Sequence, residues 1–104
     1  MTDTDVFRAL ADPTRRAVLE RLMAAEMNVS ELTANFAVSQ PAISQHLAVL
    51  RQAGLVTERR EGRRAFYRAD TAGLQPLVDW VDRYRRFWPD RIDRLKTLLK
   101  EMDQ

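Results

Sequence analysis

The chain has 104 residues, of which 45% are hydrophobic and 31% are charged, and its formal net charge is +2. This size and balance predict a single globular domain over residues 1–104 with one modest core. The absence of cysteine excludes disulfides, thiolate metal sites and thiol redox sensing. No apolar run approaches the roughly 20 residues that span a bilayer, and the acidic N-terminus lacks the features of a signal peptide. We therefore expect a cytoplasmic protein without a membrane partner.

The first quarter of the chain predicts two helices. The first, Thr4–Leu10, has apolar residues at helical spacing, namely Val6, Phe7 and Leu10. Asp12 and Pro13 mark the start of the second, because Asp can cap the first amides and Pro needs no hydrogen bond in the first turn. We expect this helix to reach about Ala25. Its predicted inward residues are Val18, Leu19, Leu22 and Met23.

A short helix, a turn and a longer helix are predicted next. Asn28 and Glu31 have the spacing of a capping box. The helix that they begin is expected to bury Val29, Leu32 and Phe36. Ser39 is the expected N-cap of the longer helix, which spans Ser39–Ala53 and ends before Gly54. Its buried face follows the i, i+4, i+7 pattern at Ile43, Leu47 and Leu50.

The opposite face of the helix Ser39–Ala53 carries short, uncharged polar side chains. Gln can bond an adenine edge with two hydrogen bonds, and Ser can bond several base edges. Such a face suits a helix that reads a DNA major groove, whereas an ordinary solvated helix usually carries pairs of Glu and Lys. The predicted DNA-binding residues of this helix are Ser39, Gln40, Pro41, Ser44, Gln45 and His46.

A basic β-hairpin follows. Residues 55–60 and 64–69 are predicted strands across a short turn that contains Gly62, and the inward face of the second is expected at Ala65, Tyr67 and Ala69. Residues 39–68 carry six Arg against two Glu, which suits a surface that faces phosphates. A charged edge hairpin can also serve only to prevent aggregation. In this wing, residues 59–64, the predicted DNA contacts are Arg60, Arg63 and Arg64.

Two features leave alternatives open. Arg15 and Arg16 either touch the DNA backbone or pair with Asp12 and Glu20. His46 is the only histidine, and a lone His beside a buried Leu is more often a packing or hydrogen-bonding residue than a base or metal ligand.

No nucleophile–base pair or acid–base carboxylate pair is recognisable. We therefore expect no enzyme activity and no cofactor.

Residues 74–104 form the predicted dimerisation segment, a helix or a helix pair. Apolar residues recur at steps of three or four, close to a coiled-coil seam, and Pro89 must kink or divide the helix. Packing against a second copy would bury this seam. Alternatively, the domain is a protein-interaction module that binds another protein there. The expected interface residues of the segment are Leu77, Val81, Tyr84, Trp88, Ile92, Leu95 and Leu99.

Four runs of the chain are specific when taken together: FRALADPTRR at 7–16, SQPAISQHL at 39–47, LRQAGLV at 50–56 and REGRRAFY at 60–67. They closely resemble the corresponding segments of ArsR/SmtB-family transcriptional repressors. The resemblance covers about residues 4–70. It implies a mainly α fold with a small β-hairpin, a winged helix-turn-helix in which four helices precede the hairpin and a C-terminal helix, kinked or split near Pro89, follows it.

The family resemblance also implies a function. Such a protein is a homodimer that binds an inverted-repeat operator in double-stranded DNA and is released by an inducer. Its interface uses the first and last helices, which adds Val6 and Phe7 to the expected contacts. Basic charge on the wing favours this reading over the interaction module.

The chain departs from the family at the metal-sensing sites. Metal-sensing members carry Cys-x-Cys before the turn, where this chain has Asn28 and Ser30. Others carry Asp and His on the last long helix, where this chain has Asp79 and Asp82 but no His. We therefore expect a metal-independent repressor, which either responds to an unidentified small-molecule inducer or acts through its own abundance.

Overall fold

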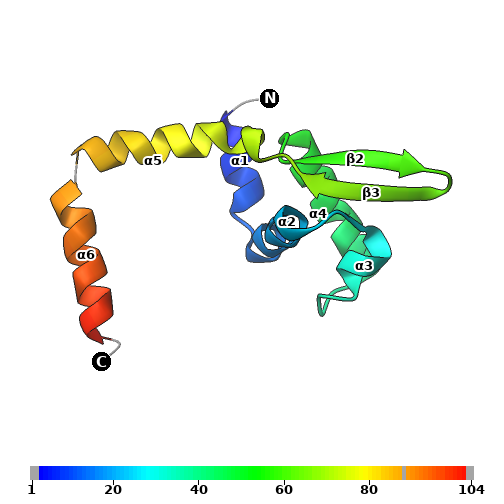
Figure 1. Ribbon diagram of the computed structural model, residues 1–104, viewed down its shortest axis with the longest axis horizontal. Helices are drawn as coiled ribbons and strands as arrows, with labels where there is room; N and C mark the ends of the chain where they lie inside the picture. Colours follow the sequence, from blue (N-terminus) through cyan, green and yellow to red (C-terminus); the bar gives the residue numbers. More distant parts are fainter. Residues whose placement is uncertain (1–2, 88, 103–104) are drawn as a thin grey trace.

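The protein, seen here as a computed structural model that describes residues 3–87 and 89–102, combines helices with one small sheet (Figure 1). The helices are α1 (Asp3–Leu10), α2 (Pro13–Ala24), α3 (Val29–Thr33), α4 (Gln40–Gln52), the 3-10 helix η1 (Thr71–Leu74), α5 (Gln75–Phe87) and α6 (Pro89–Met102). The strands are β1 (Met27–Asn28), β2 (Val56–Glu61) and β3 (Arg64–Ala69). The predicted mainly α fold with a small β-hairpin is confirmed.

Local capping interactions fix where the helices begin and end. The Asp12 carboxylate accepts a hydrogen bond from the amide of Arg15, the third residue of α2, at 3.0 Å, and the Ser39 hydroxyl accepts one from the amide of Ala42, the third residue of α4, at 3.3 Å. Asn28 and Glu31 form the predicted capping box, with reciprocal bonds of 2.8 and 3.1 Å. Gly54 ends α4 at φ +77°, a left-handed conformation that glycine adopts without strain.

Arg15 and Arg16 join α2 to α1. Arg15 Nε donates to the Ala9 carbonyl at 2.6 Å, and Arg16 Nη1 donates to the Leu10 carbonyl at 2.7 Å. Carbonyls in the last turn of a helix have no intrahelical donor, and a cation there also favours the helix dipole. The two arginines thus hold the α1–α2 corner, a role that the sequence did not predict.

The core lies between α1, α2, α3, α4 and the start of β2. The predicted seam of α4 is confirmed, since Ile43, Leu47 and Leu50 are buried. Met23 was wrongly expected to face inward: it is 46% exposed, because it lies in the last turn of α2, where the chain leaves the core. The buried residues are Val6, Ala9, Val18, Leu19, Leu22, Leu32, Ile43, Leu47, Leu50, Ala53, Leu55 and Val56.

The sheet is antiparallel with strand order β1–β3–β2. Glu61 pairs with Arg64, so the hairpin turn has two residues, and Gly62 supplies the positive φ, +63°, at the first of them. As predicted, Tyr67 and Ala69 of β3 pack inward against the core. Strand β1 was not predicted, because two residues carry no alternation that could be read.

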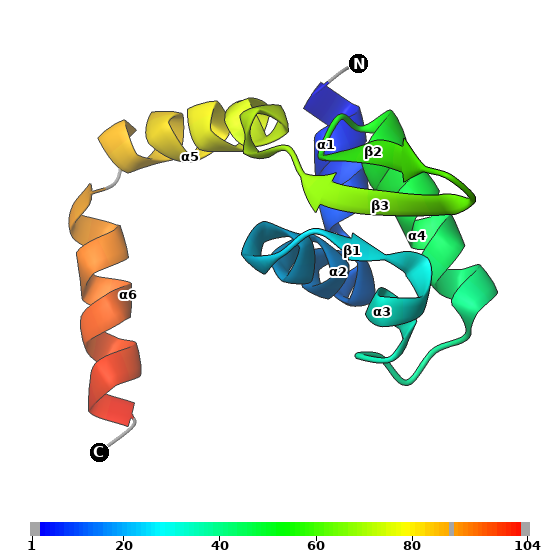
Figure 2. The same ribbon diagram turned by 45° about the vertical axis from the view of Figure 1, so that its right-hand side comes forward.

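The C-terminal segment is two helices. Helix α5 extends away from the winged domain and α6 turns steeply from its end, so that α6 stands apart from α1–β3 in both views (Figures 1 and 2). Helix α6 begins at Pro89, which lacks the amide hydrogen that a continuous helix would need. None of the helices in the described ranges is long and apolar enough to cross a membrane.

Candidate nucleic-acid interface

Helix α4 presents a polar face opposite its buried seam. Gln40, Ser44 and Gln45 are all exposed, and their side chains are uncharged. The seam anchors the helix, since burying each large aliphatic side chain contributes about 1.5–3 kcal/mol. The polar groups therefore project from a fixed helix, a geometry that suits base readout in a groove.

The other three residues predicted on this helix are placed differently. Ser39 and Pro41 are exposed in the first turn, where the Ser39 hydroxyl caps the helix. His46 is only half-exposed, and its Nδ1 is buried without a hydrogen-bond partner among the described residues. His46 is also close enough to Asp12 to contribute to lowering the pKa of that carboxyl, after the backbone hydrogen bond from Arg15. It is therefore partly turned into the protein, unlike the exposed Gln45.

The outer face of the hairpin holds Arg59 in place. Its guanidinium lies 4.9 Å from the centre of the Phe66 ring, within the range of a cation–π contact. It also donates to Glu26 at 2.6 Å and to Glu61 at 2.8 Å. The hydrogen bond to Arg59 lowers the pKa of Glu26, and the pKa of Arg59 is raised by its bonds to Glu26 and then Glu61. Arg59 thus ties the hairpin to the segment before β1.

The inner face of the hairpin holds a second ionic group. Glu58 Oε2 accepts from Arg51 Nη1 at 2.5 Å, and Glu58 Oε1 lies 3.0 Å from Arg60 Nε. The Glu58 side chain is only 7% exposed, whereas those of Arg51 and Arg60 are 61% and 73% exposed. One covered carboxylate therefore connects the end of α4 to the wing and leaves two guanidinium groups facing solvent.

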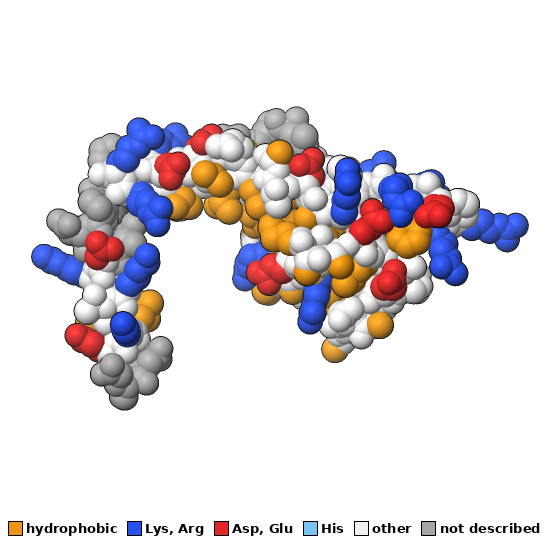
Figure 3. Space-filling model, viewed as in Figure 1, with side chains coloured by type: hydrophobic (Ala, Val, Ile, Leu, Met, Phe, Trp, Pro, Cys, Tyr) orange, Lys and Arg blue, Asp and Glu red, His pale blue; other side chains and the backbone are white. Residues whose placement is uncertain are grey.

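The tip of the hairpin, unlike its two faces, carries arginines that are not paired with carboxylates among the described residues. Arg63 and Arg64 are exposed and make no ion pair within residues 3–87 and 89–102. Figure 3 shows Lys and Arg side chains projecting at this end of the molecule. Their guanidinium charge is available to an anion, so the three predicted wing residues divide into one paired arginine, Arg60, and two unpaired ones.

Sequence reasoning missed Arg51, Glu58 and Tyr67 at this surface. The signal was present: Glu58 pairs with Tyr67 across β2 and β3, and Tyr67 was predicted to face inward. An acidic residue on an inward face requires a cationic partner. Arg51, in the last turn of α4, supplies one.

The predicted dimer interface forms a partly exposed apolar surface over α1, α5 and α6. The ring centres of Phe7 and Trp80 lie 6.1 Å apart with the rings at 68°, and those of Trp80 and Tyr84 lie 4.5 Å apart. Orange side chains line the underside of α5 in Figure 3. Leu77 is half-buried, and the large hydrophobic residues left exposed here are Phe7, Val78, Trp80, Val81, Tyr84, Leu95, Leu98, Leu99 and Met102.

Val6 does not share this surface. It is 2% exposed and belongs to the protomer's own core, because the short helix α1 turns Val6 and Ala9 inward together. Its assignment to the interface is corrected accordingly. Trp88 and the side chain of Ile92 lie outside the described residues.

Known proteins resemble this chain over most of its length. Residues 12–58, from the cap of α2 to β2, match the family described as bacterial regulatory protein, arsR family. The chain is 36% identical over 77 residues to the transcriptional repressor SdpR of Bacillus subtilis (strain 168), covering 74% of this chain and 86% of the relative. It is 48% identical over 82 residues to the HTH-type transcriptional regulator Rv2034 of Mycobacterium tuberculosis (strain H37Rv), covering 79% and 74%.

A solved structure gives the same result for the fold. An ArsR-like transcriptional regulator from Rhodococcus sp. RHA1 superposes with a TM-score of 0.72 at 34% sequence identity, over 92% of this chain and 91% of that one. The match includes the winged helix-turn-helix. All three similar proteins are described as regulators of transcription rather than as enzymes.

Proposed function

Because this chain belongs to the ArsR family of bacterial regulatory proteins, which are DNA-binding regulators of transcription, we propose that it is a homodimeric repressor of an inverted-repeat operator. The observation that carries the proposal is the exposed, uncharged polar face of α4 beside a wing with unpaired arginines. One protomer places α4 in one major groove, and the second copy places its own α4 in the next half-site.

The proposed contacts have two distinct roles. Gln40, Ser44 and Gln45 read base edges, because their side chains are exposed, uncharged and held by the buried seam. Arg63 and Arg64 neutralise phosphates or enter the minor groove, since guanidinium groups bind phosphate with a fork of donors. Ser39, Pro41, Arg60 and His46 complete the proposed set, with His46 only half-exposed at its edge.

A second copy of this chain is the proposed occupant of the apolar surface. The exposed apolar residues continue from α1 onto α5 through the Phe7–Trp80–Tyr84 contacts, and Leu95 and Leu99 on α6 are more than half exposed. An apolar surface of this extent is rare on a monomer. Two-fold pairing of the surface would also place the two α4 helices for a palindromic operator.

We also propose that DNA binding does not depend on a metal ion. The chain has no cysteine to bind soft ions. At the positions where metal-sensing relatives are expected to carry ligands, Asn28 is engaged in a capping box and Asp79 accepts a hydrogen bond from Gln75 at 2.9 Å. The signal is then an unidentified small molecule or the abundance of the protein itself. Low-micromolar Zn²⁺, Cd²⁺ or As(III) should leave the operator complex intact, and stoichiometric release of DNA by any of them would refute this part.

The proposed function is tested with fluorescence anisotropy. A duplex that the protein selects from a random library is compared with a scrambled duplex of the same composition. We expect a dissociation constant below about 10⁻⁸ M for the selected duplex and at least roughly 10³-fold weaker binding to the scrambled one. Equal binding to both duplexes would show that the protein does not recognise DNA sequence, and would favour the protein-interaction module.

A further inference from the structure

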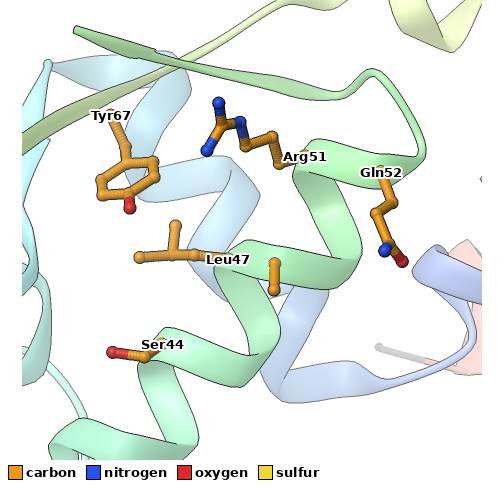
Figure 4. Close-up of a pocket in the computed structure, with 6 residues that line it drawn as sticks. Ser44, Leu47, Arg51, Gln52 and Tyr67 are labelled. Carbon is orange, nitrogen blue, oxygen red and sulfur yellow. The ribbon is translucent and has the colours of Figure 1, made fainter.

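A hollow lies between α4 and the hairpin, next to the proposed base-reading face. It has a volume of about 460 Å³ and is lined by Ser44, Leu47, Ala48, Arg51, Gln52 and Tyr67. We refer to it as the helix–wing pocket. Figure 4 shows Arg51 entering it from α4 and Tyr67 from β3, with Ser44 about two turns nearer the start of the helix than Arg51. Leu47 forms its apolar floor because that side chain belongs to the core.

Arg51 is held in place at this pocket. Its Nη1 donates to Glu58 Oε2, while Glu58 Oε1 faces Arg60 Nε at 3.0 Å. A guanidinium has five N–H donors, so most donors of Arg51 and Arg60 remain for another acceptor. The group of one carboxylate and two guanidiniums keeps a net charge of +1. Its carboxylate is 7% exposed and its cations are open to solvent, so an approaching anion meets the positive charge first.

Tyr67 completes the pocket with a neutral donor. It pairs with Glu58 across the two strands, and burial, then the negative charge of Glu58 and a hydrogen bond to it, raise the pKa of its hydroxyl. The hydroxyl therefore keeps its proton at neutral pH and can donate a hydrogen bond. Two kinds of donor, a forked cation and a phenol, thus border one hollow.

The position of the pocket indicates the ligand. In the proposed complex, α4 occupies a major groove and the wing approaches the neighbouring minor groove. One strand of the DNA backbone separates those two grooves, so it must cross the surface between α4 and the hairpin. That surface is the helix–wing pocket.

We propose that the helix–wing pocket binds a backbone phosphate of the operator through Arg51 and the Tyr67 hydroxyl, and that Glu58 is the positioning residue that orients Arg51 and Arg60 for it. This inference rests on the proposed function. Glu58 lowers the cost of binding because it already restricts two flexible side chains in the free protein. It also connects the wing to α4, so that the two elements contact the DNA in a fixed position relative to each other.

The test combines salt dependence with a neutral phosphate. Binding of the selected duplex is measured by anisotropy between 0.05 and 0.2 M salt, about the range where phosphate contacts dominate. Arg51→Ala should reduce the slope of log K against log salt by about one unit and weaken binding about tenfold. Arg68→Ala is the matched control, since Arg68 is on the same strand as Tyr67 but on the opposite face, and it should change the slope much less.

Methylphosphonate substitution then locates the contact. In the unmodified protein, one neutralised phosphate per half-site should weaken binding, and the same substitution should have almost no further effect on Arg51→Ala. Arg51→Lys, which keeps the charge but not the fork, should recover the salt slope and only part of the affinity. It also keeps the test valid if Arg51→Ala unfolds.

Glu58→Gln separates positioning from charge. The substitution raises the net charge by one, so a purely electrostatic role predicts tighter binding, whereas positioning predicts weaker binding. Unchanged salt slopes and methylphosphonate effects in Arg51→Ala, or tighter operator binding by Glu58→Gln, would overturn the inference while the operator is still selected. Failure of the unmodified protein to select any duplex would instead refute the proposed function.

Discussion

At the scale of single residues, the partner of each arginine decides its role. The hairpin contains several guanidinium groups, but Arg59 is held by Glu26, Glu61 and Phe66, whereas Arg63 makes no ion pair among the described residues. The composition identified the basic segment but could not show which of its arginines are free to contact DNA. That ranking depends on Glu26, which is distant in sequence and is brought close only by the fold.

Arg63 and Arg59 should therefore respond differently to truncation. Arg63→Ala is expected to weaken binding to all duplexes and to lower the salt slope by about one unit, because one phosphate contact is lost. Arg59→Ala is expected to leave the slope nearly unchanged and to lower the melting temperature of the free protein. Anisotropy and circular dichroism measure the two effects, and equal salt slopes for the two variants would contradict the division.

At the scale of elements, the sequence predicted the helices better than the sheet. The caps at Asp12, Asn28 and Ser39 are local signals, since each bonds an amide three residues away. The i, i+4, i+7 seam of α4 likewise repeats within one element. By contrast, β1 exists only because it pairs with β3, about forty residues later, as at Met27 and Tyr67. The division at Pro89 was recognised as a breaking point, but the direction of α6 depends on packing.

The cap of α2 makes stability depend on pH. A hydrogen bond from the Arg15 amide, followed by the nearby charges, holds the pKa of Asp12 below its ordinary value of 3.8. The carboxylate therefore stabilises the folded state above its unfolded pKa, and this contribution is lost as the pH falls through the lower, folded pKa. The difference in melting temperature between the unmodified protein and Asp12→Ala should be largest near pH 7 and shrink as the pH falls below the ordinary value of 3.8.

Asp12→Ser provides the control for this prediction. A Ser hydroxyl also caps a helix but does not titrate in this range, so its melting temperature relative to Asp12→Ala should be constant with pH. If the effect of Asp12→Ala were the same at pH 7 and pH 3, the capping carboxylate would not be the titrating group.

At the scale of the whole molecule, the two ends of the chain give the protein a second surface. The core of the winged domain contains twelve buried hydrophobic residues among those that the structure describes, whereas α5 and α6 leave large apolar side chains exposed outside it. The dimension along the longest axis, 52 Å, results mainly from this extension. This shape supports the proposed dimer, in which the terminal helices would hold two DNA-reading faces in register.

The proposed dimer predicts a position on α6 where a charge would disrupt assembly. Leu99→Glu is expected to convert a dimer to a monomer at micromolar concentration, because the substitution introduces a charge into an apolar contact. Thr97→Glu changes the net charge equally but lies on the opposite side of the helix, where the Thr97 hydroxyl bonds the Asp93 carbonyl at 3.0 Å. Sedimentation velocity should show a dimer for Thr97→Glu. A monomeric unmodified protein would contradict the assembly, and a dimeric Leu99→Glu would move the interface away from α6.

The central claim, that α4 reads DNA sequence on behalf of a two-fold dimer, is tested most directly by in vitro selection from a random duplex library with the unmodified protein and with Gln45→Ala. We predict that the unmodified protein enriches an inverted repeat and that Gln45→Ala relaxes the preference at one base pair in each half-site, symmetrically, at a cost of roughly 1–3 kcal/mol if the contact is bidentate. Enrichment of no repeat, or the same sequence preference for both proteins, would contradict the account.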